Sequence, residues 1–354
     1  MADNQAAAFC ILDRPFVVWS DDQGSDNRAF LDSIDHNFYY RTVHRVFFPS
    51  DDTSSLDFDD EQQRKDQSAF ARLLWHHGAE SLLMLIGALI QAPHAVEGFF
   101  LRCRNEDCRA IAQYLISSNL PANLCLARSD FSLDKLVESI HNCAGWNDNG
   151  VTISYFTRSL TNIFREFDRD DHRAEYNSIK HGLRATHGQF GLAMGLQDAP
   201  GIPAPAERMQ NIVSSKDGSH FPSVSPISGI VKAEQKRQFT IRHHSLGWSL
   251  EKTLCEIQLF STFIGNVVSA LKISEGAGAE NVKFERPEDA DCWWTTYFAM
   301  SATGVRNFSF GPSVGVLRSP TSADKKASEF YKKHAELRKQ NDALHQQHVK
   351  DERR

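Results

Sequence analysis

The feature that most constrains the fold is a long stretch of helical periodicity from about Glu61 to Ile90. Its first turns place Phe70, Leu73 and Leu74 on one side, which is the spacing of an amphipathic helix. Its second half is apolar almost all the way round, which is typical of a helix at the centre of a core. Pro93 ends the pattern. The sequence therefore predicts that the remaining elements pack around this helix.

Shorter periodic segments surround this stretch. They predict helices over residues 28–48, 96–103, 106–117, 132–141, 152–167, 172–186 and 249–273. Ser132 is a suitable N-cap for its helix. Apolar runs at 9–12 and 16–19 have the character of strands, and residues 208–247 predict a β-hairpin or small meander. The expected fold class is mainly α, a helical bundle with a small β insertion.

Composition changes along the chain suggest four parts. Residues 1–60 form a strand-and-helix segment, and residues 61–275 form the bundle core with the β insertion at about 208–247. Residues 276–320 are an aromatic-rich mixed segment. Residues 321–354 are a charged tail, either helical or disordered.

Composition also limits the class of protein. The net charge of -6 gives no general attraction to nucleic acid, so RNA binding requires a local basic patch. Seven scattered cysteines without a Cys-x-x-Cys pair favour reduced thiols. The N-terminus lacks the pattern of a signal peptide, and the apolar run from Leu82 to Ile90 is too short to span a bilayer. We expect a soluble, cytoplasmic protein with no membrane partner.

The densest group of reactive side chains lies in the predicted helix at 172–186. Asn177, Lys180 and His181 are three and four positions apart, so a helix presents them on one face. An imidazole transfers protons near neutral pH, an ammonium holds a phosphate and an amide orients its neighbours. The alternative is a structural helix, in which the imidazole and amide satisfy buried backbone groups while Lys180 extends to water.

Asn177 followed by His181, within a helix of a helical bundle, resembles the HEPN superfamily, whose signature places an Arg shortly before a His, often with an Asn after the Arg. Here Arg173 stands further from His181 than in that signature, and Arg184 lies one turn beyond. The resemblance covers the helices at 152–187 and 249–273. It implies a metal-independent endoribonuclease of the toxin or anti-phage defence type, without a cofactor, that acts on RNA as a homodimer.

The same resemblance implies a role for each of these residues. His181 would serve as acid or base, Asn177 would orient it, and Lys180 with Arg173 or Arg184 would hold the phosphate. Other members of the superfamily are non-catalytic. The alternative function is therefore a ligand-binding or assembly protein in which these polar residues form a buried structural network.

A second polar group lies within the long central helix. His77 and Glu80 are three apart, and His76 and Glu80 four apart, as metal ligands on one helix face would be. Glu138 and His141 have the same spacing, but no further pair completes a two-metal site. We therefore expect no metal.

We expect instead that Glu80 and His77 form a buried polar network, because a buried carboxylate needs a partner. Lys180 and His181 are candidate partners for Glu80.

A basic cluster lies in the β insertion. Its candidate RNA-binding residues are Arg237, Arg242, His243 and His244, with Phe239 among them. Cations interleaved with an aromatic side chain can contact phosphates and bases. The alternative is an exposed strand edge protected by charge.

Overall fold

The computed structural model describes residues 5–20, 23–48, 61–117, 132–146, 150–181, 184–196, 204–226, 238–287, 290–302 and 315–318, with a few isolated positions beyond them. Contacts divide the chain into two units. The first unit comprises Met1–Pro222 and His244–Phe310, and the second comprises Ser223–His243 and Gly311–Arg354. The buried polar groups and the cavities discussed below lie in the first unit.

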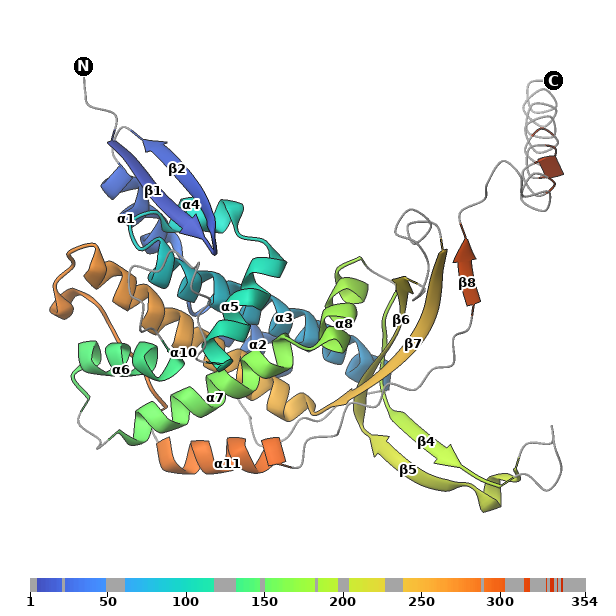
Figure 1. Ribbon diagram of the computed structural model, residues 1–354. Coiled ribbons are helices and arrows are strands. Elements are labelled where there is room, and N and C mark those ends of the chain that lie inside the picture. The colour runs from blue at the N-terminus through green and yellow to red at the C-terminus, as the bar shows by residue number, and fades with distance from the viewer. Residues whose placement is uncertain are drawn as a thin grey trace, which may run out of the picture. The chain divides into compact units, whose positions relative to one another are not determined.

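The predicted central helix is confirmed as α3, Glu61–Gln91. It packs most extensively against α10, Leu250–Ser274, the other long helix of the core (Figure 1). Gly78 lies where the two helices meet, and a Cβ added there would be 2.3 Å from Cδ2 of Phe260. Glycine is therefore required for this close approach, because a larger side chain would displace the phenyl ring.

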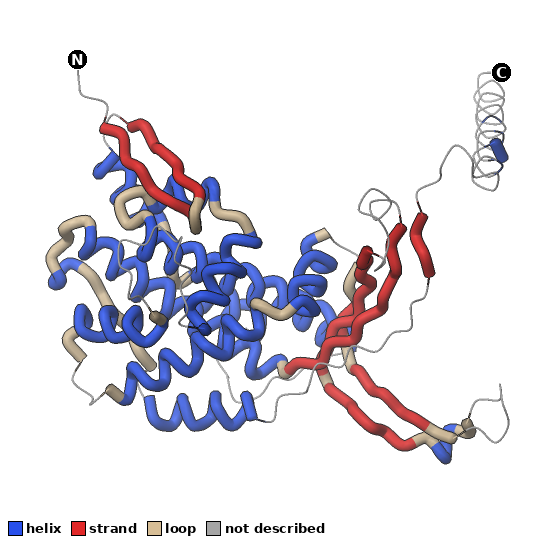
Figure 2. Tube along the Cα trace, in the orientation of Figure 1, coloured by secondary structure: helices blue, strands red, loops and turns tan. Residues whose placement is uncertain are grey.

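The predicted class, mainly α with a small β insertion, is confirmed (Figure 2). The other described helices are α1 Gln23–Ser33, α2 Phe38–Phe47, α4 Val96–Arg102, α5 Asn105–Ser117, α6 Leu133–Ala144, α7 Val151–Phe167, α8 Asp170–Lys180 and α11 Ala290–Ala302. Ser132 caps α6 as predicted, since its hydroxyl accepts the N–H of Lys135. Short 3₁₀ turns lie at Ala206–Arg208 and Ala279–Asn281.

Two predicted helices have different bounds in the structure. The single helix predicted at 28–48 is wrong, because a turn at residues 34–37 separates α1 from α2. There the N–H of His36 bonds to the carbonyl of Ile34, and the N–H of Phe38 to that of Asp35. The helix predicted at 172–186 begins at Asp170 and ends at Lys180, so His181 is its C-cap.

The strands form small antiparallel sheets. β1 Gln5–Ile11 and β2 Arg14–Ser20 make the predicted N-terminal hairpin. The β insertion is present but begins earlier than predicted. Its strands are β3 Thr186–His187, β4 Phe190–Met194, β5 Gln210–Ser215, β6 Asp217–Pro226 and β7 Gln238–Trp248. β8, Gly315–Arg318, pairs with the first residues of β7, and the strand orders are β3-β6-β7-β8 and β4-β5.

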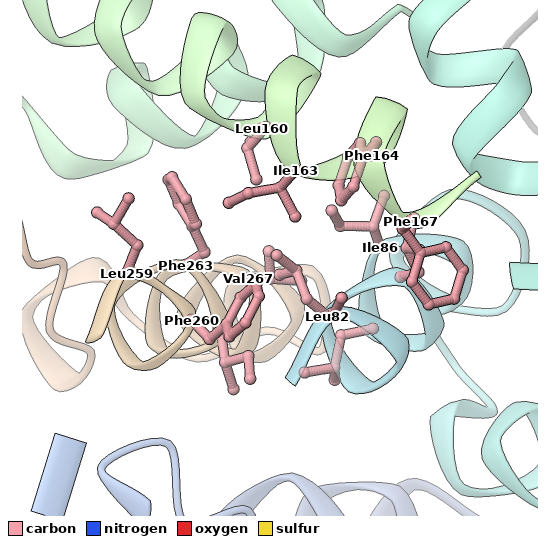
Figure 3. Packing of buried hydrophobic residues seen from close by; sticks show 14 of the residues in the cluster. Leu82, Ile86, Leu160, Ile163, Phe164, Phe167, Leu259, Phe260, Phe263 and Val267 are labelled. Atoms are coloured by element: carbon pink, nitrogen blue, oxygen red, sulfur yellow. The ribbon is translucent and has the colours of Figure 1, made fainter. Parts of the chain in front are cut away.

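The core is formed mainly by side chains of α3, α7 and α10, which point toward one another (Figure 3). Among its members, Leu82, Ile86, Leu160, Ile163, Phe164, Phe260, Phe263 and Val267 are nearly or wholly inaccessible. Burying one such side chain stabilises a fold by about 1.5–3 kcal/mol. This core fixes the helices that carry the polar groups described next.

α3 and α10 are long and apolar enough to cross a bilayer by length and composition alone. Within their most apolar windows, 61% and 78% of the residues are buried inside the protein. That burial is the property of core helices, and it accounts for their composition without a membrane.

Candidate functional site

Helix α8 carries polar side chains on two opposite sides. Asp170 and Asp171 occupy its first turn, where a helix favours negative charge. Arg109 from α5 reaches this turn and pairs with Asp168 at 2.7 Å and with Asp170 at 2.9 Å. These ion pairs fix the start of the helix. The rest of α8 has an outer polar face and an inner polar face, described in turn below.

The outer face of α8 consists of Arg173, Asn177 and Lys180, with His181 at the C-cap. All four side chains are exposed. Positions 173, 177 and 181 are spaced four apart, and position 180 lies three residues after 177, so the four positions share one side. Arg184, also exposed, follows after the end of the helix. The candidate site residues of the sequence motif thus lie on the surface, where a large substrate can reach them.

A small hollow beside α8 is lined by Phe167, His172, Arg173, Tyr176, His76, Asn105 and Arg109. Its volume of about 10 Å³ is that of a single water molecule. A nucleotide does not fit inside it. Any polymer that binds here must therefore lie across the outer face of α8.

The inner face of α8 holds a buried ion pair. Arg72 of α3 and Glu175 of α8 are both fully inaccessible, and Nη2 of the arginine lies 2.5 Å from Oε2 of the glutamate. Nε of Arg72 donates to the other carboxylate oxygen at 3.2 Å. The Ser219 hydroxyl of β6 donates to the same carboxylate, and Trp248 of β7 donates to Ser219. Burial alone would raise the pKa of Glu175, but the charge of Arg72 and the hydrogen bonds from His76 and Arg72 together hold that pKa well below its usual value.

Two buried histidines adjoin this pair. Nδ1 of His172 lies 3.0 Å from Nη2 of Arg72. Because a guanidinium only donates, this nitrogen accepts and the ring is neutral, with its proton on Nε2. Burial lowers the pKa of His172 to about 4, which agrees with that assignment. Nε2 of His76 lies 3.0 Å from Glu175, so it carries the proton and donates.

The same cluster extends into α7 and α10. Lys252 lies 3.0 Å from Glu166 and 3.4 Å from Glu256. Burial alone would raise the pKa of Glu166, but Lys252, His172 and Arg72 bring it to about 2. Burial raises the pKa of Glu256. Its two oxygens accept from Trp75 at 2.6 Å and Tyr297 at 2.8 Å.

We call this set the buried charge cluster. It comprises Arg72, His76, Glu166, His172, Glu175, Lys252 and Glu256. It joins four helices through paired charges, which is the condition for burying charge at tolerable cost. Its contacts join α8 directly to α3 and α7, and Lys252 joins α7 to α10.

A stack of side chains links the outer face to this cluster. Nζ of Lys180 lies 5.3 Å from the centre of the Tyr176 ring, within range of a cation–π interaction. The Tyr176 ring stacks on His76, with ring centres 4.8 Å apart and planes at 19°. His76 in turn bonds to Glu175. The position of the Lys180 ammonium therefore depends on the buried cluster.

The expected partners of Glu80 differ in the structure. Glu80 accepts from the Tyr176 hydroxyl at 2.8 Å and from the Asn105 amide at 3.3 Å, in place of Lys180 or His181. His77 is exposed, and its Nδ1 lies 2.7 Å from the Tyr39 hydroxyl. The two residues do not form the buried network expected of them, because His76 rather than His77 faces α8.

The basic cluster of the β insertion is described only in part. Arg237 and the side chain of Arg242 lie outside the described residues. His243 is exposed and belongs to the second unit. His244 is half-buried and stacks on Phe221, with ring centres 5.2 Å apart. His244 thus has a packing role in the first unit.

Within the described part of the chain, no group of three or more His, Cys, Asp or Glu side chains could hold a metal. Glu138 is exposed, and His141 packs its ring against Trp146. Of the described cysteines, Cys103, Cys108, Cys143 and Cys255 are free thiols.

Sequence reasoning missed most of the buried charge cluster. Arg72 and His76 are four residues apart, in phase with buried Ala79 and Leu83 of α3. Glu256 lies between buried Leu254 and Ile257 of α10. A charged residue in phase with an apolar face must find a buried partner, and that signal was available in the sequence.

Comparison with known proteins adds no assignment, since no family model, curated protein or solved structure matches this chain.

Proposed function

We propose that the chain is a HEPN-like, metal-independent endoribonuclease that binds and cleaves RNA on the outer face of α8. The observation that carries this proposal is the exposure of Arg173, Asn177, Lys180 and His181 together on one side of a helix fixed by buried charge. Exposed cations bind a phosphate backbone, and an imidazole beside them can transfer the proton. A defence or toxin role in the cytoplasm belongs to the same proposal.

The reaction is attack of a ribose 2′-hydroxyl on the adjacent phosphorus. The hydroxyl proton passes to a base, the bond to the 5′-oxygen breaks, and that oxygen takes a proton as it leaves. The products carry a 2′,3′-cyclic phosphate and a 5′-hydroxyl. His181 acts as base or acid, Asn177 orients it, and Lys180 with Arg173 or Arg184 stabilises the charge that develops on the phosphate.

The outer face of α8 carries one imidazole, that of His181, and this favours a homodimer. Attack by the 2′-hydroxyl needs a base, and departure of the 5′-oxygen needs an acid. A second copy of the chain would supply the second His181. Exposure of the outer face leaves it accessible to such a partner.

The test is cleavage of a mixed-sequence, end-labelled RNA by purified protein in EDTA. We expect cyclic phosphate ends, and a loss of roughly 100-fold or more for His181→Ala, as general acid–base catalysis predicts. His94→Ala is the matched control, because its side chain is 71% exposed and it lies on another surface. Absence of cleavage by the wild-type protein, or equal losses in both variants, would contradict the proposal.

A second candidate function is a non-catalytic binding or assembly protein. It is favoured by the buried charge cluster, in which the inner polar residues of α8 are fully engaged in structure. In the same experiment this candidate gives RNA or protein binding without cleavage, and binding that does not depend on His181.

A further inference from the structure

A second cavity, separate from α8, lies beside α10 and α11. Its volume is about 960 Å³, which is within the range of small-molecule sites. α10, the segment 283–287 and α11 form its walls, and Tyr40 of α2 closes part of it. Neither the outer face of α8 nor the basic β insertion contributes to it.

One wall of the cavity is aromatic. Trp293 and Tyr297 of α11 stack on each other, with ring centres 5.4 Å apart and planes at 19°. The Tyr297 hydroxyl donates to buried Glu256, which fixes its ring. Tyr297 is wholly inaccessible and therefore supports the ring of half-buried Trp293. A Trp293 ring fixed in this way favours a planar ligand, because stacking on it costs little conformational entropy.

Two cations lie at the same cavity. Lys283 is 82% exposed and pairs with Glu285 at 2.6 Å. An exposed pair of this kind contributes little stability, so an anionic ligand can replace the glutamate. Arg286 lies with its guanidinium 5.5 Å from the ring centre of Trp146, which holds it at the cavity. Arginine and lysine together suit a phosphate group.

Neutral polar groups complete the lining. Gln258 and Thr262 of α10 and Thr296 of α11 present an amide and two hydroxyls. These groups donate and accept hydrogen bonds, as the edge of a nucleobase and the hydroxyls of ribose require. An aromatic wall, hydrogen-bonding groups and paired cations are thus combined in one cavity.

We propose that this cavity binds a nucleoside monophosphate. The base stacks against half-buried Trp293, whose ring the wholly buried Tyr297 supports, and the phosphate binds Lys283 and Arg286. The site goes beyond RNA cleavage at α8, because it takes a single nucleotide and uses none of the outer-face residues.

Isothermal titration calorimetry of the full chain tests this site. The ligands are the four ribonucleoside monophosphates, with adenosine, ribose 5-phosphate and inorganic phosphate as partial ligands. We expect at least one monophosphate to bind, and each partial ligand to bind at least about tenfold more weakly, because each lacks one of the two recognition elements.

Thr296→Trp and Thr295→Trp form a matched pair. Both positions are exposed on α11, but only Thr296 lines the cavity. We expect Thr296→Trp to abolish binding and Thr295→Trp to leave it unchanged. Lys283→Glu should weaken binding by about tenfold, since it replaces a phosphate-binding cation with an anion. Far-UV circular dichroism checks that each variant is folded.

Three results would overturn the proposal: no heat from any monophosphate up to about 1 mM, binding that survives Thr296→Trp, or inorganic phosphate binding as tightly as the nucleotides. His181→Ala separates this proposal from the previous one. We expect that variant to bind the nucleotide normally even though RNA cleavage is lost.

Discussion

Removing one partner of the Arg72–Glu175 pair should destabilise the protein strongly. Both side chains are fully inaccessible, and the arginine makes two of the hydrogen bonds that Glu175 accepts. In Arg72→Met the carboxylate keeps only His76 and Ser219 as donors. Stranding a buried charge in this way costs about 3–5 kcal/mol, so we expect that loss in the free energy of unfolding.

A double variant measures the interaction free energy between Arg72 and Glu175. Glu175→Gln leaves Arg72 with one carboxylate partner, the longer contact to Glu166 at 3.5 Å, beside its hydrogen bond to the neutral His172 ring, and should cost about 3 kcal/mol. In Arg72→Met/Glu175→Gln neither charge is stranded. The double variant should therefore be more stable than the sum of the two single losses predicts, by about 2–3 kcal/mol.

Urea unfolding at pH 7, followed by both circular dichroism and tryptophan fluorescence, provides the measurement. Arg41→Met is the control, because Arg41 and Asp35 form an ion pair with both side chains about half exposed. It should leave the unfolding midpoint nearly unchanged. Losses in the two single variants that simply add, or a loss below about 1 kcal/mol in Arg72→Met, would refute the assignment of the cluster as the anchor of α8.

Further outcomes follow from the same contacts. Stability should fall as pH drops from about 6.5 toward 4, because burial lowers the pKa of His172 to about 4 and the unfolded chain binds that proton more readily; urea titrations across this window should show a shallower decline for His172→Gln. The decline should continue from about 4.5 toward 2, where the lowered pKa of Glu166 acts in the same direction, whereas the raised pKa of Glu256 opposes the decline only above about 4.5. Gly78→Ala should cost about 1–3 kcal/mol in thermal unfolding, since the new Cβ meets Phe260, and a gain from helix propensity alone would contradict this. Ser249→Ala should cost about 1 kcal/mol, because the Ser249 hydroxyl caps α10 by accepting the N–H of Lys252, and Ser249→Asp should restore it.

The sequence predicted the long helices well because their periodicity extends over many turns. α3 and α10 lie within a few residues of their predicted bounds. The wrong helix bounds lie where a few residues decide whether a helix continues or ends. α1 and α2 share one apolar spacing, and only the local hydrogen bonds at Asp35 and His36 separate them. α8 ends at Lys180, before its predicted bound, and Thr186 and His187 pair with β6 as β3, a tertiary pairing that local propensity does not encode.

The candidate site also has a part that the sequence could predict and a part that it could not. The outer face of α8 was predictable from spacing, since Asn177 and Lys180 share a side in any helix of this register. The partner of Glu80 was not predictable, because it depends on how α8 is rotated against α3. That rotation places Tyr176 toward Glu80 and directs Lys180 outward.

The two faces of α8 explain why so short and polar a helix is held firmly. Its eleven residues offer few buried apolar contacts, so propensity alone would leave it marginal. The ion pair between Glu175 and Arg72 supplies the missing stabilisation. Tyr176 stacks on His76 and contacts the Lys180 ammonium, so it connects the buried contacts to the outer face. The exposed side chains of the outer face therefore lie on a fixed helix, and they are not needed for its packing. Removal of an outer-face residue should then impair the RNA cleavage that we propose while leaving the unfolding midpoint almost unchanged, whereas removal of Arg72 should lower both.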